Sequence, residues 1–419
     1  MIRIDHVALY TGKESFQDGA VLVEGDRILY AGDRAACPPA DGAQHIHGGG
    51  GILMPGFYNG HCHAAMTLER GVGSDLNLHD WLHMIWPIEA NLTPEIVYWG
   101  TMHANMEMLM RGCLGYADMY FFEEEVGRAA LDSGIRVNLS RGCMNIKEVD
   151  SVRTLYRNWH EKGEGKIRVS MGVHGEYTST SEMVRHAVEV GNELGAGFHV
   201  HMSETRFETD GCLERRGVTP TRYFYDMGML ASRTLCAHCV HMNDEDIRLM
   251  ADSGAYMVHN PASNLKLASG FAPVERMRKA GVKVALGTDG ASSNNTLDMM
   301  GDMRLASILQ KGLTGDPTAL NAADSISMAT RSGAEALGWD AGLIEEGRQA
   351  DMILLDGSAE NLIPMPDIPA AIVYAAQGLN VTMSMVQGKV LYRDGQFLTL
   401  DPEEVKGKAL EAARELGVI

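Results

Sequence analysis

The 419-residue chain carries little positive charge and no long apolar run, and both absences narrow what it can do. Its 36 lysines and arginines are outnumbered by 55 aspartates and glutamates, which gives a formal net charge of −19. A surface of that sign is repelled by phosphates, so we expect neither a nucleic acid nor an anionic membrane as a partner. No stretch of about 18 apolar residues is present, so we expect no membrane-spanning helix.

Cysteines are also few, and nothing at the N-terminus looks like a targeting segment. Seven cysteines, an odd number in so long a chain, fit a reducing compartment better than a disulfide framework. Cys236 and Cys239 form a Cys-x-x-Cys motif inside an apolar, strand-like run, so we interpret them as packing residues. The first residues, Met1-Ile-Arg-Ile-Asp-His, contain no apolar signal region. Together these features predict a cytoplasmic protein.

The two ends of the chain share one character. Residues 1–50 and the segments after residue 350 consist of short alternating runs broken by turns such as Gly25-Asp26. This pattern is typical of short antiparallel strands. We therefore predict a small β-sandwich formed from both termini, with a closing helix over Pro402–Leu416.

Between the ends, apolar strand candidates alternate with helical stretches. The strand candidates end near His63, Tyr120, Arg141, His174, Ser203, Val240, Pro261 and Asp289. The helical stretches include Pro94–Arg111, Ser181–Leu194, Asp244–Ser253 and Leu297–Lys311. Eight strands alternating with helices over roughly 230 residues are typical of an α/β fold, the (β/α)8 TIM barrel. A doubly wound open sheet is the competitor, but it does not explain why polar residues gather at one strand end after another.

These patterns predict three segments in the chain. Residues 1–56 form the N-terminal part of the β-sandwich, and residues 57–345 form the (β/α)8 barrel with a metal site. Residues 346–419 form the C-terminal part of the sandwich plus the closing helix.

A pair of histidines follows the first apolar strand of the middle region, in Pro55-Gly-Phe-Tyr-Asn-Gly-His61-Cys-His63. Residues i and i+2 of a strand share a face, so His61 and His63 project side by side, as metal ligands do. The pattern alone carries little weight, because His45-Ile-His47 and His199-Val-His201 repeat it. Histidines bonded to the backbone are the alternative interpretation.

Three further strand ends carry metal-binding or acid–base residues, and they give the histidine pair its partners. They are His199-Val-His201-Met-Ser-Glu204, Ala237-His238-Cys239 and Gly287-Thr-Asp289-Gly. Each alone also fits a histidine bonded to a carbonyl or an aspartate that caps a helix. Because catalytic residues of the barrel lie at the C-terminal ends of its strands, together they supply His, His, His and Asp to one cation. Such a metal lowers the pKa of its bound water toward about 7, and Glu204 and Asp289 are further proton-transfer groups.

The chain resembles the amidohydrolase superfamily, and within it the 5′-methylthioadenosine/S-adenosylhomocysteine deaminases. The similarity covers nearly the whole chain. It rests on His61-Cys-His63-Ala-Ala-Met-Thr-Leu-Glu-Arg-Gly, Trp86-Pro-Ile-Glu89, His201-Met-Ser-Glu204-Thr, Ala237-His238-Cys239-Val, the segment 259–270, Gly287-Thr-Asp289-Gly and the closing segment 342–351.

The resemblance implies a hydrolytic deaminase that converts an adenosine-type nucleoside to the inosine-type product and ammonia. The substrates would be 5′-methylthioadenosine, S-adenosylhomocysteine, adenosine or 5′-deoxyadenosine. One zinc ion per chain, with Fe2+ or Mn2+ as alternatives, would be bound by His61, His63, His201 and Asp289. Glu204 would protonate N1 of the purine while hydroxide attacks C6, and Asp289 would take the water proton. His238 would orient the hydroxide.

The resemblance also implies contacts to the rest of the substrate. Glu89 would bind the ribose 2′- and 3′-hydroxyls, because a carboxylate accepts from both. His174 would contact the purine edge, and Trp81 would pack near the 5′ substituent. Arg141 and Arg153 would pair with the homocysteine carboxylate, although an exposed helix charge is the alternative for Arg153.

Two positions depart from the family's pattern. Where these deaminases often have His-Ala-Pro-Tyr, this chain has His174-Gly-Glu176-Tyr177. A carboxylate there would alter the preferred 5′ substituent, unless Glu176 faces solvent. Cys62 stands where threonine is commoner, and its side chain should point away from the metal.

The alternative function is that of a related amidohydrolase acting on a free heterocycle, such as a triazine chloro- or aminohydrolase, or a guanine or pterin deaminase. The scaffold and metal would be the same, but Glu89 and Arg141 favour a nucleoside, because a flat ring without ribose gives them nothing to bind. A binding protein that has lost catalysis is disfavoured by the presence of Glu204, His238 and Asp289. A homo-oligomer is compatible with the sequence.

Overall fold

The computed structural model describes residues 1–419, which divide into two compact units. The first unit comprises Met1–Tyr58, Met106–Gly115 and Asp298–Asp401. The second comprises Asn59–Asn105, Tyr116–Leu297 and Pro402–Ile419. No helix combines the length and apolar character needed to cross a membrane.

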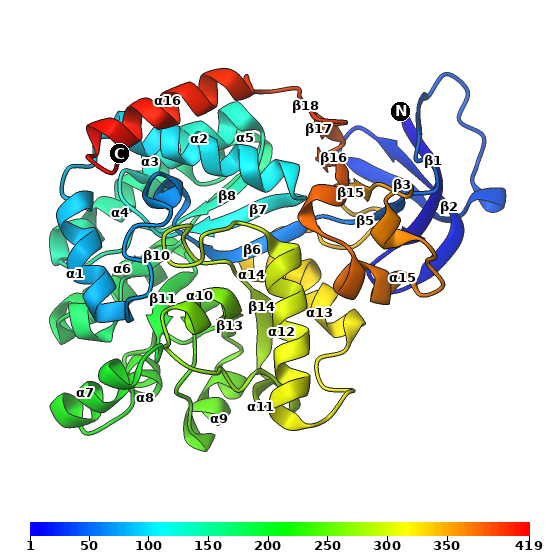
Figure 1. Cartoon of the computed structure of the whole chain (residues 1–419). Helices are drawn as coiled ribbons and strands as arrows, with labels where there is room; N and C mark the ends of the chain where they lie inside the picture. The colour runs from blue at the N-terminus through cyan, green and yellow to red at the C-terminus, as the bar shows by residue number, and fades with distance from the viewer. The chain divides into compact units, whose positions relative to one another are not determined.

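The first unit is built on a nine-stranded sheet that combines strands from both ends of the chain (Figure 1). Its order is β18-β17-β16-β15-β5-β1-β2-β3, with β4 beside β1. The strands are β1 (Ile2–Tyr10), β2 (Ser15–Glu24), β3 (Arg27–Asp33), β4 (Gln44–His47), β5 (Ile52–Pro55), β15 (Met352–Leu355), β16 (Val381–Val386), β17 (Lys389–Arg393) and β18 (Gln396–Phe397). The antiparallel pair β5–β15, with Met352 opposite Pro55, joins the two ends of the chain.

Alternation along these strands gives the sheet an apolar face. Ile4, Val21, Leu53 and Met385 belong to one cluster of buried side chains, as expected when every second residue faces a core. Four helices complete the unit: α12 (Met299–Thr314), α13 (Ala322–Ala329), α14 (Arg331–Leu337) and α15 (Ile368–Ala370).

Asp351, the last residue of the closing motif, has a structural role in the first unit. Its side chain is fully buried, accepts a hydrogen bond from the backbone N–H of Gln387 at 2.6 Å and contacts the Tyr58 hydroxyl. Each contact pairs a buried polar group that would otherwise destabilise the fold.

The second unit contains a series of strands in which parallel pairing predominates. The strands are β6 (Phe57–Cys62), β7 (Cys113–Asp118), β8 (Arg136–Leu139), β9 (Ile167–Val169), β10 (Met171–Val173), β11 (Phe198–Met202), β12 (Thr234–His238), β13 (Tyr256–His259) and β14 (Lys283–Leu286). They form two sheets, with the strand orders β6-β7-β8-β9 and β10-β11-β12-β13-β14. The pair β8–β9 and all four pairs of the second sheet are parallel. Only Ser170 separates β9 from β10. The backbone N–H of Asp289, just after β14, donates to the carbonyl of His61 in β6 at 3.0 Å, so the last strand of the series ends beside the first.

Helices follow most of these strands, so the mixed α/β class is confirmed. They are α1 (Leu78–Glu89), α2 (Pro94–Met110), α3 (Glu123–Ser133), α4 (Ile146–Trp159), α5 (Lys162–Gly165), α6 (Ser181–Leu194), α7 (Arg206–Arg216), α8 (Pro220–Asp226), α9 (Asp244–Ser253), α10 (Pro261–Lys266), α11 (Val274–Lys279) and α16 (Pro402–Glu415). The predicted bounds of α6 and α9 are confirmed, because polar caps and glycines mark their ends. Thr180 accepts from the N–H of Met183 at the start of α6, and Gly195 closes it with a φ of 63°.

Candidate active site

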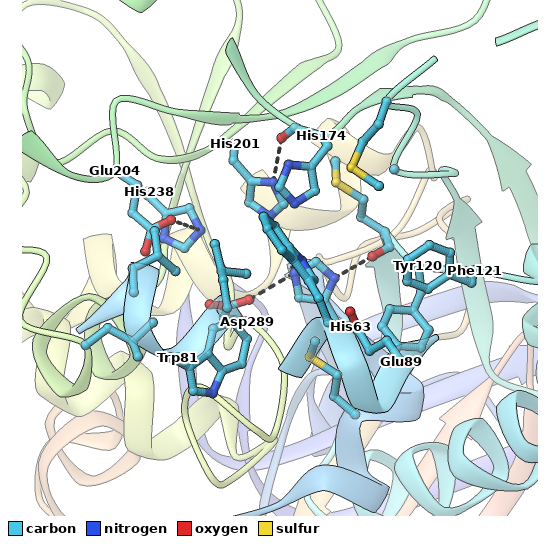
Figure 2. A pocket seen from close by; sticks show the side chains of 18 of the residues that line it. His63, Trp81, Glu89, Tyr120, Phe121, His174, His201, Glu204, His238 and Asp289 are labelled. Carbon is cyan, nitrogen blue, oxygen red and sulfur yellow. Dashed lines mark hydrogen bonds and ion pairs between the residues drawn. The ribbon is translucent and has the colours of Figure 1, made fainter. Parts of the chain in front are cut away.

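A cavity in the second unit opens where the parallel strands end (Figure 2). The side chains that line it include imidazoles, carboxylates and aromatic rings. The lining includes His63, Met66, Trp81, Trp86, Glu89, Met119, Tyr120, Phe121, Met144, His174, Tyr177, His201, Glu204, His238, Leu267 and Asp289. Polar side chains at one end and aromatic rings around them are typical of a small-molecule site.

Four side chains converge at one end of this cavity. The Nε2 atoms of His63 and His201 lie 3.4 Å apart, and Asp289 Oδ1 lies 3.4 Å from His61 Nε2 and 3.3 Å from His63 Nε2. Ligand atoms of His61, His63 and His201, and likewise of His61, His238 and Asp289, lie within 4.8 Å of one another. His61 Nε2 is buried and has no hydrogen-bond partner. Three imidazole nitrogens and one carboxylate oxygen around one point fit a metal ion of the zinc type.

The protonation of these rings bears on metal binding. Burial lowers the pKa of His61 to about 3 and that of His201 well below its ordinary value, so both are in the neutral form that binds metals. Burial also opposes protonation of His63, but the hydrogen bond and charge of Asp289 outweigh it and raise the pKa of His63 to about 9. A metal bound at this position would compete with a proton for Nε2 of His63.

Asp289 is held on three sides by the protein. Its Oδ2 accepts from the hydroxyls of Ser263 at 2.5 Å and Ser293 at 2.8 Å, and its Oδ1 accepts from the N–H of Gly290 at 2.8 Å. Burial opposes its ionisation, but the imidazole rings of His61 and His63, whose Nε2 atoms lie 3.4 Å and 3.3 Å from Oδ1, outweigh burial and hold the pKa of Asp289 well below its usual range.

The backbone is strained where three of the strands end. Ser203, His238 and Asp289 have φ values of 48°, 76° and 64°, although none is a glycine. Such conformations cost free energy, and they persist where the surrounding structure imposes them, often at functional sites.

Glu204 and His238 form the second polar group of the cavity. Glu204 Oε2 lies 3.6 Å from His238 Nε2, and its Oε1 accepts from the Ser269 hydroxyl at 3.1 Å. Burial raises the pKa of Glu204, which favours the protonated form that a general acid needs. Asn264 Oδ1 lies 2.8 Å from His238 Nδ1 and orients that ring.

The turn that carries Glu204 is fixed by a residue that sequence reasoning missed. The carboxylate of Glu208 accepts from the backbone N–H groups of Ser203 at 3.0 Å and Glu204 at 2.8 Å. Glu208 is buried inside the first turn of α7. Its spacing four residues after Glu204 was visible in the sequence, but spacing alone did not indicate that it turns back toward the strand end.

The other end of the cavity is acidic and aromatic. Glu89 at the end of α1 lines it, and Glu89 Oε1 is buried without a hydrogen-bond partner. Behind it, the Tyr120 hydroxyl donates to Glu69 Oε1 at 3.3 Å, and Glu69 is fully buried. Burial, together with the neighbouring charge of Glu89, raises the pKa of Glu69 to about 8. Sequence reasoning missed Glu69, because nothing in Thr67-Leu-Glu69-Arg signals that the acid is buried.

Comparison with known proteins agrees with this geometry. The model of the amidohydrolase family matches residues 52–391. This chain belongs to the amidohydrolase family. A relative named 5-methylthioadenosine/S-adenosylhomocysteine deaminase, from Symbiobacterium thermophilum, is 42% identical over 413 residues, which are 96% of this chain and 95% of the relative. A relative named 5′-deoxyadenosine deaminase, from Methanothermobacter thermautotrophicus, is 39% identical over 421 residues, which are 97% and 98% of the two chains.

A solved structure resembles the whole amidohydrolase chain. It is the crystal structure of an adenosine deaminase from Xanthomonas campestris with bound zinc, with a TM-score of 0.94 and 30% sequence identity. The match covers 100% of this chain and 99% of the other. The family is metal-dependent, which agrees with the converging histidines and aspartate.

Within this amidohydrolase, the substrate residues suggested by sequence fall into two groups. Trp81, Glu89 and His174 line the cavity (Figure 2). Arg141 and Arg153 do not. Arg141 donates to the Ser151 hydroxyl at 2.9 Å and to Glu124 at 3.2 Å. Arg153 pairs with Glu193 at 2.8 Å and with Asp150 at 2.7 Å.

The two positions that depart from the family's pattern are both buried. Glu176 neither faces solvent nor lines the cavity, because its two oxygens accept from Arg215 and Arg216 at 2.5 Å each. This ion pair ties the turn after His174 to α7. Cys62 is fully buried and lies outside the cavity wall.

Proposed function

We propose that this amidohydrolase is a zinc-dependent deaminase of adenosine-type nucleosides. The substrates proposed are 5′-methylthioadenosine, S-adenosylhomocysteine, adenosine and 5′-deoxyadenosine. The observation that carries the proposal is a single cavity with metal-type ligands at one end and the buried carboxylate of Glu89 at the other. The names of the two relatives and of the zinc-bound adenosine deaminase support the same chemistry.

The scaffold that we propose is a (β/α)8 barrel over residues 57–345, with a β-sandwich contributed by residues 1–56 and 346–419. The order of strands β6 to β14 and the bond from Asp289 N–H to the His61 carbonyl support closure of the barrel. The β5–β15 pair supports a terminal β unit shared by both ends.

One metal ion per chain would be held by His61, His63, His201 and Asp289, and zinc is the ion that this donor set favours over Fe2+ or Mn2+. When bound, the ion supplies a Lewis acid that lowers the pKa of a water molecule toward about 7. The orphaned Nε2 atom of His61 supports its role as a ligand.

Three side chains of the cavity would transfer protons or orient the attacking water. Glu204, which burial keeps readily protonated, delivers its proton to N1 of the purine and makes C6 electrophilic. His238, within 3.6 Å of Glu204, orients the attacking water, and the ionised Asp289 takes a proton from that water. Asp289 passes that proton to the amino group, which leaves as ammonia as its bond to C6 breaks. The new hydroxyl at C6 returns its proton to Glu204, and the inosine-type product remains.

The remaining contacts distinguish the substrates. Glu89 would accept from both ribose hydroxyls, His174 would contact the purine edge, and Trp81 would pack beside the 5′ substituent. Arg141 and Arg153 would reach a homocysteine carboxylate only by exchanging the ion pairs that they form now. Binding of S-adenosylhomocysteine therefore includes a rearrangement that small 5′ groups do not need.

The test is ammonia release from a panel of compounds. It includes the four proposed nucleosides, 2′,3′-dideoxyadenosine, adenine, guanine and a chlorinated triazine. We expect the ribonucleosides to be turned over far faster than the others. Equal turnover of adenine and adenosine would overturn the nucleoside proposal, and fast turnover of guanine or triazine alone would replace it with the free-heterocycle function.

A further inference from the structure

The three histidines proposed as ligands differ in what holds their second ring nitrogen. His63 Nδ1 contacts the carbonyl oxygen of Met119, and His201 Nδ1 lies 2.6 Å from the carbonyl oxygen of His174. A carbonyl can only accept, so both rings donate Nδ1–H and leave Nε2, on the side of the metal position, as the atom available to a metal. The main chain thus fixes these two ligands whatever the neighbouring side chains are.

His61 has no carbonyl at its Nδ1 and depends on side chains instead. Its Nδ1 lies 2.8 Å from Nε2 of His199, whose Nδ1 lies 2.7 Å from the hydroxyl of Ser140. That hydroxyl donates to the carbonyl oxygen of Asp118 at 2.9 Å. All four residues are fully buried, so solvent offers no competing partner.

The last acceptor determines the direction of every bond in this series. Ser140 has one hydroxyl hydrogen and uses it on the Asp118 carbonyl, so it must accept from His199 Nδ1–H. The ring of His199 is fully buried and forms no ion pair with a carboxylate that would stabilise a charge on it, so the ring is neutral and its Nε2 is an acceptor. His61 Nδ1 must then donate, which leaves the lone pair on His61 Nε2, the buried atom without a partner.

We infer that His199 and Ser140 are positioning residues that hold His61 in the tautomer and orientation required of a metal ligand. His199 and His201 are two residues apart on β11 and share a face of that strand. His201 is therefore placed to bind the metal, and His199 is placed to contact the ring of His61. The inference deepens the proposed function, because it rests on His61 as a ligand. Partners that orient a ligating histidine typically change metal affinity by about 10–100-fold when removed.

The test measures zinc affinity of the metal-free full-length protein by competition with a chromophoric chelator, without reference to turnover. His199→Leu removes the acceptor and should weaken zinc binding by about 10–100-fold. His199→Gln should restore most of the affinity, because its amide oxygen accepts from His61 and its amide nitrogen donates to Ser140. Ser140→Ala should weaken binding and Ser140→Thr should not, and this pair decides the outcome if His199→Leu fails to fold.

Asn264→Ala is the matched control, because Asn264 orients His238 and not a proposed ligand. It should slow turnover and leave zinc affinity unchanged. Equal zinc affinity in the unaltered protein, His199→Leu and Ser140→Ala would overturn the inference while the metal site stands. Failure of the unaltered protein to bind about one zinc per chain would instead count against the proposed function itself.

Discussion

The two ends of the cavity differ in how the protein holds the side chains proposed to bind a ligand. The metal end carries the proposed ligands His61, His63, His201 and Asp289, and the sugar end carries Glu89 with Glu69 behind it. At the metal end, the Nδ1 atoms of His61, His63 and His201 all have partners within the protein, so each ring is oriented in advance. At the sugar end, one oxygen of Glu89 and one of Glu69 have none. An unpaired buried polar group costs about 1–3 kcal/mol, so a ligand that pairs it gains that free energy. Under the proposed function, metal binding would therefore depend on the protein's own side chains, whereas discrimination at the sugar end would depend on hydroxyls that the substrate brings.

Loss of the ligands themselves should break the metal end completely. The double variant His61→Ala/His63→Ala leaves two of the four proposed ligands, too few to hold a zinc-type ion. We expect no bound metal and no measurable turnover, checked by elemental analysis and by ammonia release. Full occupancy in the variant, or two ions per chain in the unaltered protein, would contradict a single site at these residues.

The sugar end should show the next largest effect, through substrate discrimination. A buried carboxylate that accepts from two hydroxyls can reject an analogue without them by as much as about 10⁴–10⁵-fold in kcat/KM. We expect adenosine to exceed 2′,3′-dideoxyadenosine by a large factor of this kind, measured by ammonia release.

Glu89→Ala should erase most of that discrimination by slowing adenosine, with little change for the dideoxy compound. Glu89→Gln is the matched variant, because it keeps the shape and removes the charge. Unchanged discrimination in Glu89→Ala would remove this residue from sugar recognition and weaken the contrast between the two ends.

Glu204 tests whether proton transfer at the metal end is separate from metal binding. Glu204→Gln should lower kcat by roughly 10²–10⁴-fold, because a positioned acid–base group contributes about that much. Zinc content should stay at the level of the unaltered protein, since Glu204 Oε1 accepts from Ser269 and its Oε2 faces His238. A variant that loses its metal would place Glu204 among the ligands, and one with near-normal kcat would move the acid role to another group.

The metal end was easier to predict from sequence than the sugar end, for physical reasons. His61 and His63 follow the period of two of a strand, and the ends of parallel strands meet at one edge, so their convergence with His201 and Asp289 was predictable. The helix bounds were predictable where caps such as Thr180 mark them.

Contacts made across the fold were not predictable. Nothing local shows that His199 contacts His61, 138 residues away, or that Glu176 is neutralised by arginines of α7. The same holds for Arg141, which pairs with Glu124 of α3, and for Arg153, which pairs with Glu193 of α6. Sequence gives the residue types at such positions, whereas packing decides which groups meet.

The smallest expected effect concerns the buried acid behind Glu89, and it is a stability effect. Burial and the charge of Glu89 raise the pKa of Glu69 from 4.5 to about 8. The folded protein therefore binds more protons than the unfolded chain between these values, and the free energy of unfolding falls as the pH rises through that window. Glu69→Gln removes the titration and keeps the hydrogen bond from the Tyr120 hydroxyl. We expect the variant to match the unaltered protein at pH 5 and to exceed its free energy of unfolding by roughly 3 kcal/mol at pH 8, measured by urea denaturation. Parallel stability curves for the two proteins across this range would show that the pKa of Glu69 is not raised in the folded protein.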